Sequence, residues 1–356
     1  MKHQALDKAL EQWQSLQPLS ENDRERLSRR FTVDFNYNSN HIEGNTLTYG
    51  QTELLLLFGK VVGEANFRDC EEMKASNVGL QMMLVESSEL QQPLTQNFIR
   101  TLHRTLLRED YTVYRNLPGG VQTSYVIHAG QYKTRPNSVI TRYGDRFEYA
   151  SPEETPALMT DLVDWYNQAE KDGKLSPVEL AILFHYRYIR IHPFEDGNGR
   201  IARLMVNYIL ARHGYPMIVV RSRLKHLYLE ALHKADLIVG PTPADGAHAS
   251  LKDIRPFYKY MANLVAQEVT NDVLFVNEKD ANVWWYDGER IAFRTPTYSN
   301  ILRELRIEPK ATFAYLQEEL RVNRSALQKM LHSMQDKGYI DRDADGSWRV
   351  FITPSI

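Results

Sequence analysis

The sequence predicts a mainly α-helical protein that carries a short β-hairpin and ends in a winged helix-turn-helix. Three observations lead to this prediction. Apolar residues recur at helical spacing through most of the 356 residues, a period typical of amphipathic helices. Two short strand-like runs lie on either side of a Gly-Asp turn within residues 130–149. Residues 301–356 combine two short helical patterns with a final hairpin pattern.

We expect four segments along the chain. A helical region covers residues 1–95, a second helical domain covers residues 96–270, and a linker or β-hairpin covers residues 271–300. The winged helix covers residues 301–356. A chain of 356 residues is long enough for two or three domains with a sizeable hydrophobic core.

Helix signals dominate the first half of the chain. Thr48 is an N-cap candidate for a helix that runs into the leucines at 54–57, and a second helix covers residues 95–107. Residues 130–149 read as two short strands about Gly144-Asp145, which predicts a hairpin. Pro152 then opens the next helix.

The loop at residues 192–200 is the most informative segment. Upstream, Ser176-Pro177-Val178-Glu179 reads as a capping box with proline at the first helical position. Downstream, apolar residues within 201–209 recur at helical spacing. Gly197-Asn198-Gly199 therefore falls at a helix N-terminus, where free N–H groups and the helix dipole favour anions.

The residue types in this loop suit phosphoryl or nucleotidyl transfer, which needs positioning, charge neutralisation and an in-line nucleophile. His192 can accept a proton near neutral pH. Asp196 offers the oxygen ligand that Mg²⁺ prefers, and the two glycines let the backbone approach a phosphate closely. Arg200 and Arg203 supply fixed positive charge and bidentate donors.

The loop resembles the signature of the Fic family, His-Pro-Phe-x-Asp/Glu-Gly-Asn-Gly-Arg followed by x-x-Arg. Residues 192–203 match every fixed position of that signature, and a looser resemblance extends over about 96–240. The resemblance implies a helical Fic core with a short β-hairpin flap. It also implies transfer of AMP from ATP to a Tyr, Ser or Thr hydroxyl of a protein.

The same resemblance implies a role for each matching residue. His192 is the general base, and Asp196 binds Mg²⁺ (or Mn²⁺) between the α- and β-phosphates. Asn198, with the neighbouring amides of Gly197 and Gly199, cradles the α-phosphate of ATP. Arg200 stabilises the triphosphate, and Arg203 holds the γ-phosphate.

A second motif lies far upstream, at Ser39-Asn40-His41-Ile42-Glu43-Gly44-Asn45. Read alone, it is a polar helix end with Gly44 or Asn45 as the cap and Glu43 as a solvated charge. Beside the loop described above, it resembles the Fic inhibitory motif Ser/Thr-x-x-x-Glu-Gly/Asn. That resemblance implies that Ser39, Glu43 and Gly44 form an inhibitory helix end. Glu43 then competes with the γ-phosphate for Arg203.

The predicted hairpin fits the same scheme. In Fic proteins a β-flap at this position docks the target segment by strand addition. The resemblance implies that Lys133, Thr134 and Ile140 line this docking flap.

The C-terminal segment resembles a winged helix. Asn323 is placed to cap its second helix, and Asp345-Gly346 turns the final hairpin. The exposed face of that helix is expected to carry Arg324, Ser325, Gln328, Lys329 and His332. Residues 301–356 contain nine Lys/Arg and eight Asp/Glu, so charge does not decide between DNA binding and protein docking or dimerisation. Both readings stay open.

Composition fits a cytoplasmic protein. A net charge of −2 provides no overall attraction to nucleic acid or to an anionic membrane. The single cysteine, Cys70, excludes an internal disulfide framework and suits a reducing compartment. The longest aliphatic run is too short to span a bilayer, and the first residues lack an apolar leader. We therefore expect no membrane partner.

These observations predict an autoinhibited, Mg²⁺-dependent protein adenylyltransferase that uses ATP and modifies a protein target or itself. A homodimer and DNA remain open as partners. Two alternatives are retained. One is a transferase on the same fold that moves UMP or phosphate, and the other is a DNA-binding regulator whose Fic part senses a nucleotide.

Overall fold

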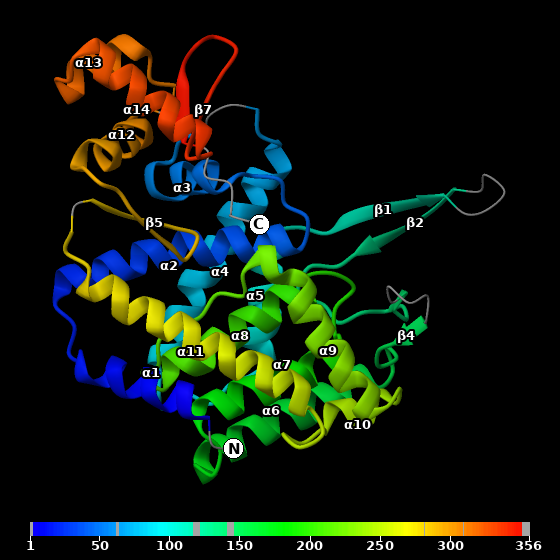
Figure 1. The fold of residues 1–356 in the computed structure, drawn as a ribbon. Coiled ribbons are helices and arrows are strands. Elements are labelled where there is room, and N and C mark those ends of the chain that lie inside the picture. Colours follow the sequence, from blue (N-terminus) through cyan, green and yellow to red (C-terminus); the bar gives the residue numbers. More distant parts are fainter. Residues whose placement is uncertain are drawn as a thin grey trace.

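The computed structural model describes residues 3–61, 64–116, 122–140, 146–280, 282–308 and 310–350. Helices dominate this part of the chain, and its strands pair only as two-stranded antiparallel hairpins. Figure 1 shows a helical body, a long hairpin that projects from it, and a C-terminal group of helices at one end. The predicted mainly α class is confirmed. In the described residues, none of the helices is long and apolar enough to cross a membrane.

The N-terminal region consists of α1 (Gln4–Ser15), α2 (Glu21–Ile42), α3 (Tyr49–Phe58), α4 (Phe67–Ser88) and α5 (Gln96–Leu107). Thr48 caps α3 in a full capping box with Gln51, as its sequence predicts, and Thr95 caps α5. The 22 residues of α2 span about 33 Å at 1.5 Å per residue. This length lets α2 run from the C-terminal part of the molecule to the functional loop.

The projecting hairpin is formed by β1 (Tyr111–Asn116) and β2 (Gln122–Ile127), which pair from Tyr111↔Ile127 to Asn116↔Gln122. The sequence analysis assigned no strands here. A second hairpin, β3 (Ser138–Ile140) with β4 (Arg146–Glu148), lies within the predicted segment and pairs Ser138 with Glu148. The predicted turn at Gly144-Asp145 lies outside the described residues.

The central domain contains α6 (Thr155–Asp172), α7 (Pro177–Ile191), α8 (Asn198–Arg212), η1 (Ser222–Leu224), α9 (Lys225–Val239), α10 (Pro243–Ala247) and α11 (Arg255–Asn277). The predicted capping box begins α7: the Ser176 side chain accepts from the N–H of Glu179, and Glu179 bonds back. The helices α7 and α8 lie at the centre of the largest core cluster, with Phe184 and Ile201 fully buried. Helix α11 continues to Asn277 without a break.

The C-terminal part contains β5 (Val283–Tyr286), β6 (Glu289–Ala292), α12 (Pro296–Ile307), α13 (Phe313–Leu320), α14 (Arg324–Asp336), β7 (Ile340–Arg342) and β8 (Trp348–Val350). Asn323 caps α14 by accepting from the N–H of Ala326, as predicted. The pair β7–β8 forms the wing, which completes the predicted helix-turn-helix and hairpin order. Helix α12 was not predicted from the sequence.

The C-terminal part shares its hydrophobic core with α2 and α3. Val33 of α2 and Tyr49 of α3 belong to the same buried cluster as Trp284, Tyr286 and Leu302. The Tyr49 and Tyr286 rings lie 4.2 Å apart between centroids. The winged helix is therefore packed onto the N-terminal helices rather than tethered to them.

A buried ionic cluster reinforces this junction. Arg221, only 2% exposed, donates to Glu268 of α11 (2.6 Å), Asp34 of α2 (2.9 Å) and Asp287 of the β5–β6 turn (3.0 Å). Asp287 also accepts from the Asn38 amide at 2.7 Å. A side chain at Gly288 would collide with the Arg221 guanidinium, so glycine is required where the turn enters the cluster.

We expect Arg221→Ala to lower the free energy of unfolding by about 3–5 kcal/mol, because it leaves three buried carboxylates without their common cation. Arg223→Ala is the matched control. Arg223 contacts the half-exposed Glu289, and an exposed pair of this kind contributes at most about 1 kcal/mol. Urea titration of both variants measures the difference. Equal losses in the two variants would contradict a structural role for the cluster.

Candidate functional site

The predicted loop joins α7 to α8, and left-handed backbone sets both of its ends. His192 is the C-cap of α7 at φ 53° and ψ 59°, and its N–H donates to the Tyr188 carbonyl at 2.9 Å. Gly197 is the N-cap of α8 at φ 75°, a region that glycine adopts without steric cost. The loop therefore brings His192 and the free N–H groups of the first turn of α8 into one short segment.

Phe194 anchors the loop from inside. Its fully buried ring stacks on His103 of α5, with centroids 3.7 Å apart and planes 6° from parallel. His103 Nδ1 accepts the N–H of Gly130 (2.8 Å), so Nε2 carries the proton and donates to the Asp196 carbonyl (3.0 Å). Burial lowers the pKa of His103 to about 4, which keeps the ring neutral. The sequence analysis did not single out His103, because nothing near residue 103 marks it.

Asn198 closes the loop on itself. Its Oδ1 accepts the N–H of Phe194 at 3.0 Å, and its Nδ2 donates to the Phe194 carbonyl at 2.7 Å. The side chain is 2% exposed. The sequence resemblance assigned this side chain to the α-phosphate, but both of its polar ends are used inside the loop. The predicted phosphate cradle formed by Asn198 and the neighbouring backbone N–H groups stays a prediction.

His192 is held as a neutral base. Its ring stacks on Tyr149, which follows β4, with centroids 3.9 Å apart. Burial, and then the nearby Lys133 ammonium, lower the pKa of His192 to about 3. The ring therefore stays unprotonated at physiological pH. Nδ1 is buried, so Nε2 is the nitrogen that can reach a substrate.

The three residues expected to line the docking flap are placed differently from one another. Lys133 is 3% exposed, and its Nζ donates to the carbonyls of Ile191 (3.1 Å) and His192 (2.8 Å). The buried Lys133 amino group thus bonds the backbone at the start of the loop, and its place in a docking flap stays a prediction. Thr134 is exposed and contacts Glu195 at 3.3 Å. Ile140 ends β3, and its side chain lies outside the described residues.

Asp196 presents a carboxylate at the edge of the loop. Its Oδ2 accepts from the Tyr111 hydroxyl at 2.6 Å and lies 3.4 Å from Arg200. Burial raises the pKa of Asp196, but Arg200, the Tyr111 hydroxyl and the N–H of Gly197 together hold it below its usual value. The side chain is 42% exposed. It is therefore an ionised carboxylate open to solvent.

Two arginines and a glycine frame an anion site at the start of α8. Arg200 is nearly buried, and its Nε has no hydrogen-bond partner among the described residues. A methyl group on Gly199 would collide with Oε1 of Glu43 and lie 3.0 Å from the Arg203 guanidinium. Gly199 thus leaves room for a carboxylate against the helix N-terminus, where an anion is favoured.

That carboxylate comes from the upstream motif. Arg203, 3% exposed, donates to Ser39 Oγ (3.1 Å), the Ser39 carbonyl (2.8 Å) and Glu43 Oε1 (2.7 Å). Burial raises the pKa of Glu43, but Arg203 and then Arg200 outweigh it and lower the pKa below the usual value. Gly44, at φ 100°, ends α2 directly after Glu43. The fold therefore brings residues 39–44 onto the loop, about 160 residues away in sequence.

Known proteins are similar to this chain in sequence and in fold. The Fic/DOC family model matches residues 93–210. A crystal structure of a Fic domain-containing signalling protein from Bacteroides thetaiotaomicron is 52% identical, with a TM-score of 0.71, over 78% of this chain and 99% of the other. The chain belongs to the Fic family. Fic-1 from Caenorhabditis elegans (residues 134–508) also matches this Fic protein, with 26% identity and a TM-score of 0.58 over 76% of this chain and 71% of the other.

Curated relatives of this Fic protein carry an activity in their names. Protein adenylyltransferase fic-1 of C. elegans is 30% identical over 238 residues, which is 67% of this chain and 40% of the relative. Protein adenylyltransferase Fic of Nematostella vectensis is 30% identical over 65% of this chain and 47% of the relative. The chain thus spans less than half the length of these relatives. A MarR family model matches residues 294–347, which supports the winged helix.

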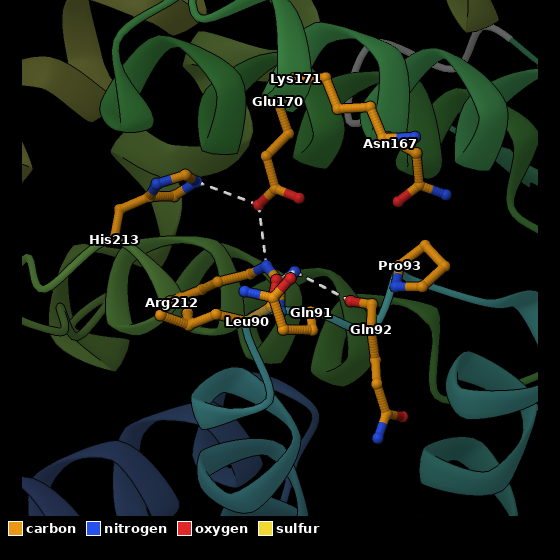
Figure 2. Close-up of a pocket in the computed structure, with 9 residues that line it drawn as sticks. All are labelled: Leu90, Gln91, Gln92, Pro93, Asn167, Glu170, Lys171, Arg212 and His213. Carbon is orange, nitrogen blue, oxygen red and sulfur yellow. Dashed lines mark hydrogen bonds and ion pairs between the residues drawn. The ribbon is translucent and has the colours of Figure 1, made fainter.

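A surface cavity of about 490 Å³ lies elsewhere on this Fic protein (Figure 2). Arg212, in the last turn of α8, lines it, so about 20 Å of helix separates it from the loop. Arg212 donates to Glu170 and to the carbonyls of Glu89, Leu90 and Gln92. Because these hydrogen bonds attach the segment before α5 to α8, we assign the cavity no part in the functional site.

Proposed function

We propose that this Fic protein is an autoinhibited, Mg²⁺-dependent protein adenylyltransferase. The observation that carries the proposal is the gathering of a neutral His192, an ionised Asp196 and the two arginines at the N-terminus of α8. A base, a metal ligand and a polyanion site are the parts needed to move a nucleotidyl group onto a hydroxyl. The names of the curated relatives support the choice of AMP.

The residues present fit a divalent cation bound together with the nucleotide. Among the described residues no group of three or more His, Cys, Asp or Glu side chains gathers as a metal site. One open carboxylate is sufficient, because Mg²⁺ commonly takes one or two carboxylates and completes its shell with phosphates and water. Asp196 would hold Mg²⁺ or Mn²⁺, and the bound cation would neutralise charge on the phosphates.

The proposed reaction uses the chain's own groups as follows. His192 Nε2 accepts the proton of a Tyr, Ser or Thr hydroxyl as that oxygen forms a bond to the α-phosphorus of ATP. The bond from the α-phosphorus to the bridging oxygen breaks, and pyrophosphate leaves. The N–H groups at the start of α8 are placed to face the anion that is being transferred, and the charge of the nearly buried Arg200 lies beside them. Arg203 anchors the γ-phosphate.

Autoinhibition is part of the proposal. Glu43 occupies the contact with Arg203 that the γ-phosphate needs, and it lies against Gly199 at the positive end of α8. One guanidinium cannot serve both anions in the same geometry. ATP would have to displace Glu43 or bind with its phosphates bent away.

The target protein is proposed to dock at the β3–β4 flap by strand addition, with Thr134 on its exposed side. Self-modification and a homodimer belong to the same proposal. Incubating the purified chain with ATP and Mg²⁺ and weighing it by mass spectrometry tests it: an added AMP supports adenylyl transfer, while an added phosphate supports a kinase. Substituting UTP for ATP tests the alternative that UMP is transferred.

The metal assignment predicts opposite outcomes for neighbouring carboxylates. Asp196→Ala is expected to remove Mg²⁺-dependent transfer, with a loss greater than the roughly 10–100-fold that follows the loss of a mere outer-shell partner of a metal ligand. Glu195→Ala is expected to change it less than about threefold, because Glu195 accepts a hydrogen bond from the exposed Thr134 hydroxyl and lies outside the glycine-bounded part of the loop. Initial rates across a Mg²⁺ titration measure both. A reversed order of effects would reject Asp196 as the ligand.

A second function is favoured by the C-terminal part. The exposed face of α14 carries Arg324, Ser325, Gln328, Lys329 and His332, in the position of a recognition helix, and the MarR family model covers it. We propose that this face binds DNA, with the Fic part acting as an enzyme or a nucleotide sensor. A gel-shift titration of the intact chain with duplex DNA, with and without ATP, tests this proposal. Binding of a protein partner alone would reject it.

A further inference from the structure

The base of the projecting hairpin reaches into the site. Tyr111 is the first residue of β1, and its half-buried hydroxyl donates to Asp196 Oδ2 at 2.6 Å. Arg200 Nη2 lies 3.4 Å from the same oxygen. Both donors converge on Oδ2, which fixes the orientation of the carboxylate, while the side chain remains 42% exposed to solvent.

Tyr111 is itself fixed from several directions. It pairs with Ile127, which is 4% exposed. The Arg68 guanidinium of α4 lies 5.5 Å from its ring centroid. Just beyond β2, the N–H of Gly130 donates to His103, which in turn holds the Asp196 carbonyl. The base of the hairpin thus contacts the Asp196 side chain directly through Tyr111 and the Asp196 carbonyl indirectly through His103.

We propose that Tyr111 is a positioning residue that orients the Asp196 carboxylate for a nucleotide-bound divalent cation. The inference rests on the proposed function. Ligating carboxylates are normally hydrogen-bonded by partners behind them, and loss of such a partner typically weakens metal affinity about 10–100-fold. A tyrosine that served only packing would not need its hydroxyl 2.6 Å from the carboxylate of the loop.

The test uses the gain in nucleotide affinity that metal provides. A fluorescent, non-hydrolysable ATP analogue is titrated into the full chain with Mn²⁺ and, separately, with EDTA, in a Glu43→Gly background. The ratio of the two affinities measures coupling between cation and nucleotide. Tyr111→Phe is expected to reduce this ratio about 10–100-fold and to leave the affinity in EDTA unchanged. Tyr114→Phe is the matched control, because Tyr114 lies on the same strand and is 74% exposed.

Each possible outcome supports or overturns the proposed role of Tyr111. An unchanged ratio in Tyr111→Phe overturns the inference, and so does an equal loss with Mn²⁺ and with EDTA, which would indicate a packing role. Asp196→Asn separates this inference from the proposed function. If Asp196→Asn loses the ratio while Tyr111→Phe keeps it, only the role of Tyr111 fails. If Asp196→Asn also keeps the ratio, the metal assignment fails with it.

Discussion

His192→Ala is expected to lower the rate of adenylyl transfer at least about 100-fold, the lower end of the contribution of a positioned general base. The ring is neutral, and Nε2 is its accessible nitrogen. Among the described loop residues, none offers a second neutral base: Asp196 is engaged by Tyr111 and Arg200, and the Asn198 amide is spent on Phe194. The measurement is the initial rate of label transfer from α-labelled ATP at saturating nucleotide.

The fold should survive this substitution. The Lys133 ammonium is held by backbone carbonyls rather than by the imidazole, and Asn198 closes the loop independently of residue 192. His213→Ala is the matched control, because His213 caps the far end of α8. A folded His192→Ala protein that transfers AMP at a third of the normal rate or faster would contradict the assigned role.

The pKa of His192 also predicts how the rate of transfer depends on pH. Because the pKa is lowered to about 3 in the folded protein, the base keeps its lone pair as pH falls through 6.5. The profile of kcat/KM, which reports the free enzyme, should therefore show no loss attributable to this histidine between pH 7.5 and 5.5. Because the folded protein resists protonation of His192, the free energy of unfolding is not affected by this group above its unfolded pKa of about 6.5. It decreases as pH falls below that value, where the unfolded chain binds the proton more readily.

Glu43→Gly is expected to raise self-modification about 10–100-fold. Removing the carboxylate frees the Arg203 guanidinium, now bonded at 2.7 Å, and removes a negative charge from beside Gly199. A hydrogen bond to a charged group contributes about 1.5–3 kcal/mol, and each 1.36 kcal/mol corresponds to about tenfold in rate. Labelling of wild type and variant at equal ATP and Mg²⁺ measures the effect.

Two further variants sharpen this test. Arg203→Ala also breaks the ion pair, but it removes the γ-phosphate anchor and should not activate. Glu43→Gln keeps the shape of the side chain while removing its charge, so it should fall between wild type and Glu43→Gly. Equal or lower labelling in Glu43→Gly would mean that Glu43 is only a helix end.

The sequence could predict those features that depend on residues close together along the chain. The capping box at Ser176, the helix N-terminus at Gly197 and the Asn323 cap are set by neighbours within a few residues. Each appears where it was expected. The ion pair between Glu43 and Arg203 is not local, and only the family resemblance suggested it.

The sequence could not predict which polar side chains form hydrogen bonds inside the protein and which stay available to a ligand. Lys133 and Asn198 have polar groups suited to ligands, yet the structure turns both inward. His103 and Tyr111 carry no motif, and they contact the loop only because the last turns of α5 and the start of β1 lie beside it. The β1–β2 hairpin did have a signal, since tyrosine, threonine and valine alternate before Pro118-Gly119-Gly120.

The buried cluster around Arg221 joins the β5–β6 turn to α2. Asp287 of the β5–β6 turn bonds Asn38, the neighbour of Ser39, which in turn holds Arg203. If ATP competes with Glu43 for Arg203, as proposed, a ligand of the winged helix that displaces this turn would also change the free energy of that contact. By reciprocity, ATP must then change the affinity of that ligand by the same factor. The affinity of the winged helix for its ligand and the affinity of the Fic site for ATP would then report on the same conformational equilibrium.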